Sequence, residues 1–147
     1  MTMLELVMHI YKKLAENPAM INDIEGEKQH LIEEGHPKKE VDRAFDLAVE
    51  KFSDPEKGTN IRYLHADESR FFTNEAYGLL MNLQMTGILQ PRIVELILTR
   101  AIVLQSGRID ADEVTQLVNF ILMNPENQGH KLAFDLITFQ NPEGDIN

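Results

Sequence analysis

Apolar residues recur three and four positions apart along most of the chain, the spacing that places side chains on one face of an α-helix. Proline and glycine interrupt this pattern and mark where helices begin and end. The pattern predicts helices at 3–15, 23–34, 37–52, from 67 or 73 to 86, 91–105 and 111–123, and a short last helix at 130–139. We therefore expect an all-α fold of about six to seven helices.

The segment 91–105 is apolar on almost every side, unlike the other predicted helices. A helix of this kind is normally surrounded by other helices, because an exposed apolar surface of that size is unfavourable in water. We expect it to be the central and most buried helix of the fold. On this interpretation Leu96, Ile97 and Ala101 are almost wholly inaccessible to solvent.

A loop and a short extended segment separate two groups of helices. Residues 53–60 are rich in proline, glycine, aspartate and asparagine, which is typical of a loop. Ile61, Tyr63 and Leu64 indicate one short strand or extended segment. The chain thus divides into an N-terminal three-helix unit, 1–60, and a C-terminal helical unit, 61–147, packed around helix 91–105. We expect the two to form one compact domain.

Three helices followed by an extended segment is the element order of a winged helix-turn-helix module, whose third helix enters a DNA groove. The charges of this third helix cancel: Lys38, Lys39, Arg43 and Lys51 stand against Glu40, Asp42, Asp46 and Glu50. A helix that lies among phosphates is expected to be more positive. A winged-helix-like N-terminal half that binds protein is therefore preferred over one that binds DNA.

The net charge of −10 is spread along the whole chain. Residues 1–60 carry 8 basic and 13 acidic groups, residues 61–147 carry 6 and 11, and each part has a net charge of −5. Nucleic-acid binders gain most of their affinity by neutralising phosphates with basic side chains. Nucleic acid is thus a disfavoured partner.

Motifs for catalysis or metal binding are missing from the sequence. It has no cysteine, and its five histidines include no pair spaced four residues apart. It also has no glycine-rich phosphate loop and no nucleophile motif. We expect no enzyme, no metal and no cofactor. No apolar run approaches the length of about 18 residues that spans a bilayer, so we expect a cytoplasmic protein without a membrane partner.

Several polar positions within the hydrophobic pattern form a recognisable combination. Ile61-Arg62-Tyr63 is followed five residues later by Glu68, and 87–92 is followed by Glu95 and Arg100. Together with 112–118 and the helix–glycine–helix pattern of 31–52, these residues resemble the bacterial Smg family over nearly the whole chain. The chain departs from the family at His36, where an aromatic residue is usual, and in lacking tryptophan in the third helix.

The resemblance implies a small cytoplasmic bacterial protein with no assigned molecular function. The candidate interaction or structural polar positions are Arg62, Tyr63, Glu68, Arg92 and Arg100. Our hypothesis is a non-enzymatic interaction or regulatory protein that binds another macromolecule, most simply a protein. The alternative is an accessory factor in DNA or RNA transactions that acts through the winged-helix-like N-terminal half.

Arg100 is the charged residue set deepest within the apolar segment 91–105. A buried guanidinium group without a partner is too costly to retain, so it needs a partner elsewhere or must extend to the surface. Glu68 and Glu75 are the expected partners. Arg100 is then a structural clamp between the fourth and fifth helices or, as the alternative, a polar anchor at a groove for a partner.

Overall fold

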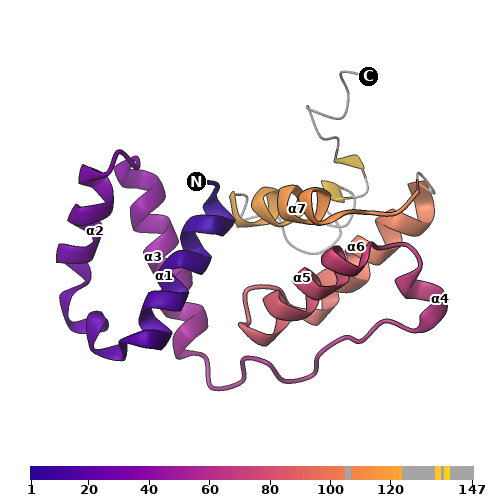
Figure 1. The fold of residues 1–147 in the computed structure, drawn as a ribbon, viewed down its shortest axis with the longest axis horizontal. Helices are drawn as coiled ribbons and strands as arrows, with labels where there is room; N and C mark the ends of the chain where they lie inside the picture. Colours follow the sequence, from indigo (N-terminus) through magenta and orange to yellow (C-terminus); the bar gives the residue numbers. More distant parts are fainter. Residues whose placement is uncertain (105–106, 124–134, 137, 140–147) are drawn as a thin grey trace. The chain divides into compact units, whose positions relative to one another are not determined.

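The computed structural model describes residues 1–104, 107–123, 135–136 and 138–139 (Figure 1). Seven α-helices and no β-strand occur among these residues, so the chain is all-α, as its hydrophobic spacing predicts. The backbone forms two compact units, residues 1–57 and residues 58–147. Within the described part, no helix combines the length and the apolar character needed to cross a bilayer.

The N-terminal unit is built from helices that pack on α3. Its elements are α1 (Met3–Glu16), a 3₁₀ helix (Pro18–Asp23), α2 (Ile24–Glu33) and α3 (Lys38–Ser53). Both α1 and α2 pack against α3. Buried side chains recur at helical spacing on the facing sides: Leu6, Val7, Ile10 and Leu14 in α1, and Val41, Ala44, Phe45 and Ala48 in α3.

Local sequence signals set the ends of these helices. Thr2 and Glu5 form a capping box at the start of α1, in which the Thr2 hydroxyl accepts from the Glu5 N–H at 3.2 Å. Gly35 ends α2 in the left-handed conformation, with φ of +107°, which favours glycine. The 3₁₀ helix after Asn17 is an element that the apolar spacing did not predict, because so short a helix has too few residues to show a period.

The winged-helix part of the prediction is not confirmed. Residues 1–57 form helices, turns and loops without a strand, and the extended residues 61–65 that follow are not part of a strand either. A wing is a pair of hydrogen-bonded strands, and neither region supplies one. The N-terminal unit is therefore described as a helical unit only.

The C-terminal unit contains four described helices. They are α4 (Ala66–Ser69), α5 (Asn74–Met85), α6 (Pro91–Leu104) and α7 (Ala111–Met123). The sequence predicted a single helix that begins at residue 67 or 73, whereas the structure has a separate helix at each place. Thr73 starts the second one, because its hydroxyl accepts from the Ala76 N–H at 3.1 Å.

Backbone hydrogen bonds join the start of α5 to the turn before α7, and the two helices pack together. The Ile109 N–H donates to the Phe71 carbonyl at 2.8 Å, and the Thr73 N–H donates to the Ile109 carbonyl at 3.0 Å. Asp110 follows directly and caps α7, because its carboxylate accepts from the Glu113 N–H at 2.8 Å. These contacts fix where α7 begins relative to α5.

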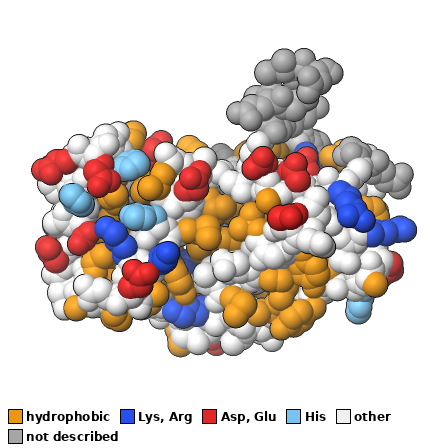
Figure 2. Space-filling view, in the orientation of Figure 1, with side chains coloured by type: hydrophobic (Ala, Val, Ile, Leu, Met, Phe, Trp, Pro, Cys, Tyr) orange, Lys and Arg blue, Asp and Glu red, His pale blue; other side chains and the backbone are white. Residues whose placement is uncertain are grey.

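The prediction that α6 is the most buried helix is wrong. Ile97 and Ala101 are buried, but Leu96 is only partly buried, and α6 buries no more of its residues than α1 does. The last turn is open: Ile102, Val103 and Leu104 are 42, 58 and 44% exposed. Other hydrophobic side chains also show on the face of the C-terminal unit that Figure 2 presents. Apolar content indicates which sides of a helix can be buried, and packing decides which of them are.

The predicted last helix, 130–139, lies largely outside the described residues. Within it, Asp135, Leu136 and Thr138 have helical backbone, and Leu136 is fully buried. Leu136 therefore belongs to the core of the C-terminal unit.

Two truncations on α6 test whether its buried side contributes more to stability than its exposed last turn. Ile97→Ala should lower the free energy of unfolding by about 2–5 kcal/mol, since it leaves a cavity at a side chain with no exposed surface. The matched control Val103→Ala, on the open last turn, should change it by less than about 0.5 kcal/mol. Urea denaturation measures both. Equal losses for the two variants would contradict this description of α6.

Candidate functional site

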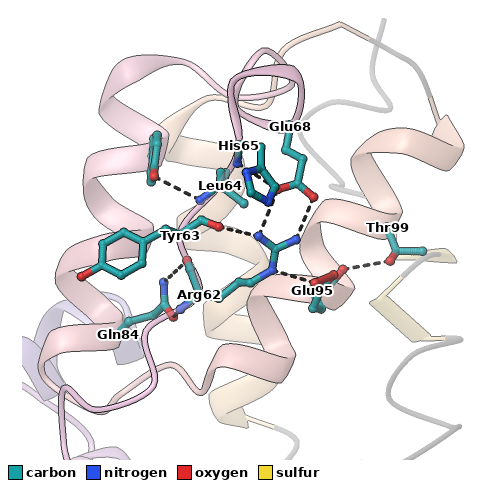
Figure 3. Close-up of polar contacts among 9 residues, drawn as sticks. Arg62, Tyr63, Leu64, His65, Glu68, Gln84, Glu95 and Thr99 are labelled. Atoms are coloured by element: carbon teal, nitrogen blue, oxygen red, sulfur yellow. Dashed lines mark hydrogen bonds and ion pairs between the residues drawn. The ribbon is translucent and has the colours of Figure 1, made fainter.

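The extended residues 61–65 are held by side chains of α5 in place of a neighbouring strand (Figure 3). The Gln84 amide makes two bonds to the backbone of Arg62: its oxygen accepts from the Arg62 N–H at 2.8 Å, and its nitrogen donates to the Arg62 carbonyl at 3.1 Å. The Tyr77 hydroxyl accepts from the Leu64 N–H at 3.1 Å. A side-chain amide has the donor and acceptor of a peptide group, so Gln84 satisfies this backbone as a strand would.

The Arg62 guanidinium then joins this segment to α4 and α6. It donates to both carboxylate oxygens of Glu68, at 3.0 and 2.7 Å, and through Nε to Glu95 at 2.7 Å. It also donates to the carbonyl of Tyr63. A planar guanidinium bound to a carboxylate by two parallel bonds has a fixed orientation. We call Arg62, Glu68, Gln84 and Glu95 the Arg62 cluster.

Charge pairing holds Arg62 and Glu68 in their ionised forms. Hydrogen bonds from Arg62, and then from the His65 N–H at 2.9 Å, lower the pKa of Glu68 to about 2. Hydrogen bonds to Glu68 and Glu95 raise the pKa of Arg62 above its ordinary value. The Arg62 and Glu68 side chains are 22% and 21% exposed, so solvent still weakens their attraction.

Tyr63 is the residue that the cluster leaves exposed. Its side chain points away from the guanidinium, and the residue is 64% exposed (Figure 3). Its carbonyl accepts from Arg62, and the N–H groups of the residues on either side are bonded to α5. The result is a large aromatic side chain displayed to solvent on a backbone that is fixed at several points.

Arg100 lies apart from the cluster and is only 5% exposed. It donates to the Leu136 carbonyl at 2.8 Å and lies 5.8 Å from the centroid of the Phe139 ring. The pKa of Arg100 is lowered, because the effect of burial exceeds the opposing effect of the Glu113 charge. Burial likewise raises the pKa of Glu113. Arg100 therefore ties α6 to the segment that contains Leu136, whereas the clamp expected from the sequence joined the fourth and fifth predicted helices.

The expected pairing of Arg100 with Glu68 is wrong. Both carboxylate oxygens of Glu68 are bound by Arg62, and Glu75 is exposed at the start of α5. Arg62 is only six residues from Glu68 and the chain turns into α4 between them, so the nearer arginine takes the carboxylate. The helical spacing of α6 could not show this, because it carries no information on where 61–65 lies.

The five candidate positions divide into two groups. Arg62, Tyr63 and Glu68 come together, whereas Arg100 is buried elsewhere and Arg92 is exposed, with its Nε donating to Gln90 at 3.2 Å. Gln84 and Tyr77 were not singled out from the sequence, and Glu95 was named only among the residues that resemble the family and not as a candidate position. Gln84 did leave a signal: it stands four residues after Leu80, at a position where the buried stripe of α5 calls for an apolar residue.

The cluster's polar groups are satisfied internally. Among the described residues, every buried side-chain nitrogen or oxygen has a hydrogen-bond partner, and no three acidic or histidine side chains are grouped to hold a metal ion. The guanidinium and carboxylates bind one another and position the backbone. The arrangement displays the Tyr63 side chain to solvent, where another molecule could contact it.

The sequence of the chain matches one family of known proteins. The model of the family described as "Protein of unknown function (DUF494)" matches residues 3–146. The chain is 27% identical over 130 residues to the protein Smg homolog of Xylella fastidiosa strain M23, a match that covers 84% of this chain and 83% of the relative. The protein Smg homolog of Stenotrophomonas maltophilia strain K279a gives the same identity and coverage. No solved structure matches the chain.

The Arg62–Glu68 pair predicts a defined pH dependence of stability. Because the pKa of Glu68 is lowered to about 2 from 4.5, the pair stabilises the fold above the ordinary pKa. This contribution is lost as the pH falls from 4.5 through about 2. Glu68→Gln should therefore flatten the fall of unfolding free energy over this range, measured by urea denaturation.

Glu75→Gln is the matched control, since Glu75 is exposed and outside the cluster. It should keep the wild-type slope. Carbon NMR of the Glu68 carboxyl gives a second measurement, with a midpoint expected near 2. An NMR midpoint of Glu68 near 4.5 would contradict this explanation. So would an equal pH dependence of the unfolding free energy in wild type, Glu68→Gln and Glu75→Gln.

Two arginines on α6 test the clamp. Arg100→Ala should lower the free energy of unfolding by about 2–4 kcal/mol, because it leaves a buried carbonyl without its charged donor. Arg92→Ala should cost less than about 0.5 kcal/mol, because Arg92 is exposed. Thermal and urea unfolding measure both. An unchanged melting curve for Arg100→Ala would contradict the structural role of Arg100 and favour the alternative, a polar anchor for a partner.

Proposed function

The chain belongs to the Smg (DUF494) family, and we propose that it acts without catalysis by binding another protein, with Tyr63 at the centre of the contact surface. The single observation that carries this proposal is the exposed Tyr63 side chain on its fixed backbone. Tyrosine is enriched among the residues that dominate the energy of protein interfaces. It combines a large apolar ring with a hydroxyl and has few rotatable bonds to immobilise.

The fixed backbone supports the proposal through the entropy of binding. Ordering a loose segment on association costs free energy, and a segment already in its bound conformation avoids much of that cost. Three anchors hold residues 62–64: the Gln84 amide, the Tyr77 hydroxyl and the Arg62 guanidinium. An elaborate polar cluster that holds an exposed aromatic residue in place is consistent with a recognition surface.

α5 also carries an exposed apolar side chain next in sequence to the cluster residue Gln84. Met85 follows Gln84, the residue bonded to Arg62, and is 61% exposed. Methionine has a flexible thioether chain and adapts to the shape of a partner. Together Tyr63 and Met85 supply the mixture of rigid and adaptable contacts that protein interfaces use.

The test is affinity capture from native lysate with the full chain as bait. Tyr63→Ala should weaken capture of the specific partner by about 30-fold, the effect of removing a contact worth about 2 kcal/mol. Ile21→Ala is the matched control, an exposed apolar residue in the N-terminal unit at 40% exposure, and should capture as wild type does. Both variants should melt as wild type does, because both side chains are exposed.

Nuclease treatment of the lysate distinguishes the alternative role. Capture through protein contacts should survive it. A partner that disappears with nuclease, or a Tyr63→Ala variant that captures normally, would contradict a protein-binding role centred on Tyr63. Loss of the partner with nuclease would favour the role in DNA or RNA transactions.

A further inference from the structure

The N-terminal unit has a groove between α2 and α3 that none of its own side chains fills. Its volume is about 440 Å³, and Ile24, Phe45 and Val49 supply its apolar lining. Phe45 forms the floor of the groove and is only 2% exposed. Ile24 and Val49 are partly exposed. The exposed parts of Ile24 and Val49 are apolar surface in contact with water, which a partner's apolar side chain would cover favourably.

One end of the groove already shows how a cation is held there. Lys28, whose side chain is 16% exposed, places its ammonium 3.3 Å from Asp42 and 3.8 Å from Glu25. The same ammonium lies 6.0 Å from the centroid of the Phe45 ring. Carboxylates and an aromatic face together attract a cation that retains an apolar stem.

The α3 edge of the groove has the same carboxylates without the cation. Asp46 and Glu50 are exposed, line the groove one helical turn apart, and form no ion pair among the described residues. Like charges four residues apart on a helix repel each other. A cationic side chain from outside would relieve that repulsion where Lys28 does not reach.

We propose that the α2–α3 groove binds a segment of another protein that carries an apolar side chain flanked by lysine or arginine. The apolar side chain lies against the accessible parts of Ile24 and Val49, and the basic residue pairs with Asp46 and Glu50. Charge selects this occupant: the carboxylates repel nucleic-acid phosphates, and a second copy of a chain with net charge −10 is a poor match for an acidic edge. This inference shares with the proposed function only the premise that the protein binds proteins, and it uses a different surface.

The probe is a short helical peptide with two leucines one turn apart and lysines on either side. Two matched peptides carry glutamate in place of lysine, or alanine in place of leucine. Fluorescence anisotropy with the full chain should show binding of the lysine–leucine peptide only, with affinity falling as salt rises. Amide NMR shifts should map to Ile24, Phe45 and Val49.

Variants of the chain locate the contact. Asp46→Asn combined with Glu50→Gln should weaken peptide binding by about fivefold or more, from the loss of two exposed ion pairs. Glu16→Gln combined with Asp67→Asn changes the net charge equally at exposed positions outside the groove and should bind as wild type does. Val49→Ala, which truncates the lining, should also weaken binding.

Tyr63→Ala should bind the peptide with wild-type affinity, so failure of this groove and failure of the Tyr63 surface are separate results. The proposal is overturned if the glutamate peptide binds equally well, or if the Asp46 and Glu50 double variant matches its control. It is also overturned if the NMR shifts map away from the groove. Groove shifts that appear on concentrating the chain without peptide would identify a second copy as the occupant instead.

Discussion

The bond pattern of Arg62 is the constraint on which the arrangement of the C-terminal unit depends. One guanidinium binds Glu68 on α4 and Glu95 on α6, while the backbone of the same residue is paired to Gln84 on α5. Three helices and an extended segment thus share one residue. An arginine suits this position because its planar fork donates in several fixed directions at once, which a lysine cannot do.

The same bonds determine what the surface can do. Because the charged groups of the cluster are paired with one another, their first role is to orient the backbone. The side chain that remains available is Tyr63, and its position follows from the bonds on either side of it. Stability and recognition are therefore coupled here: the cluster that fixes the segment is also what makes an exposed aromatic residue a preorganised contact.

The two proposed surfaces differ in chemistry as they differ in place. At the first surface the exposed contact is the aromatic ring of Tyr63, and the charges of Arg62 and Glu68 beside it are paired with each other. In the α2–α3 groove an apolar lining is bordered by carboxylates, of which Asp46 and Glu50 have no cation among the described residues. Acidic residues of this acidic chain thus border the groove, and their charge favours basic partners and disfavours phosphates.

Hydrophobic spacing and helix-end signals determined the all-α class and the positions of the main helices, because these depend on residues close in sequence. The polar positions around Arg62 and Glu68 also pointed to the family that the comparisons show. Only the tertiary structure decided that Arg62, and not Arg100, takes Glu68, and that α6 buries Ile97 while leaving Val103 open. Periodicity describes one helix at a time, whereas pairing and burial depend on which distant segment lies against it.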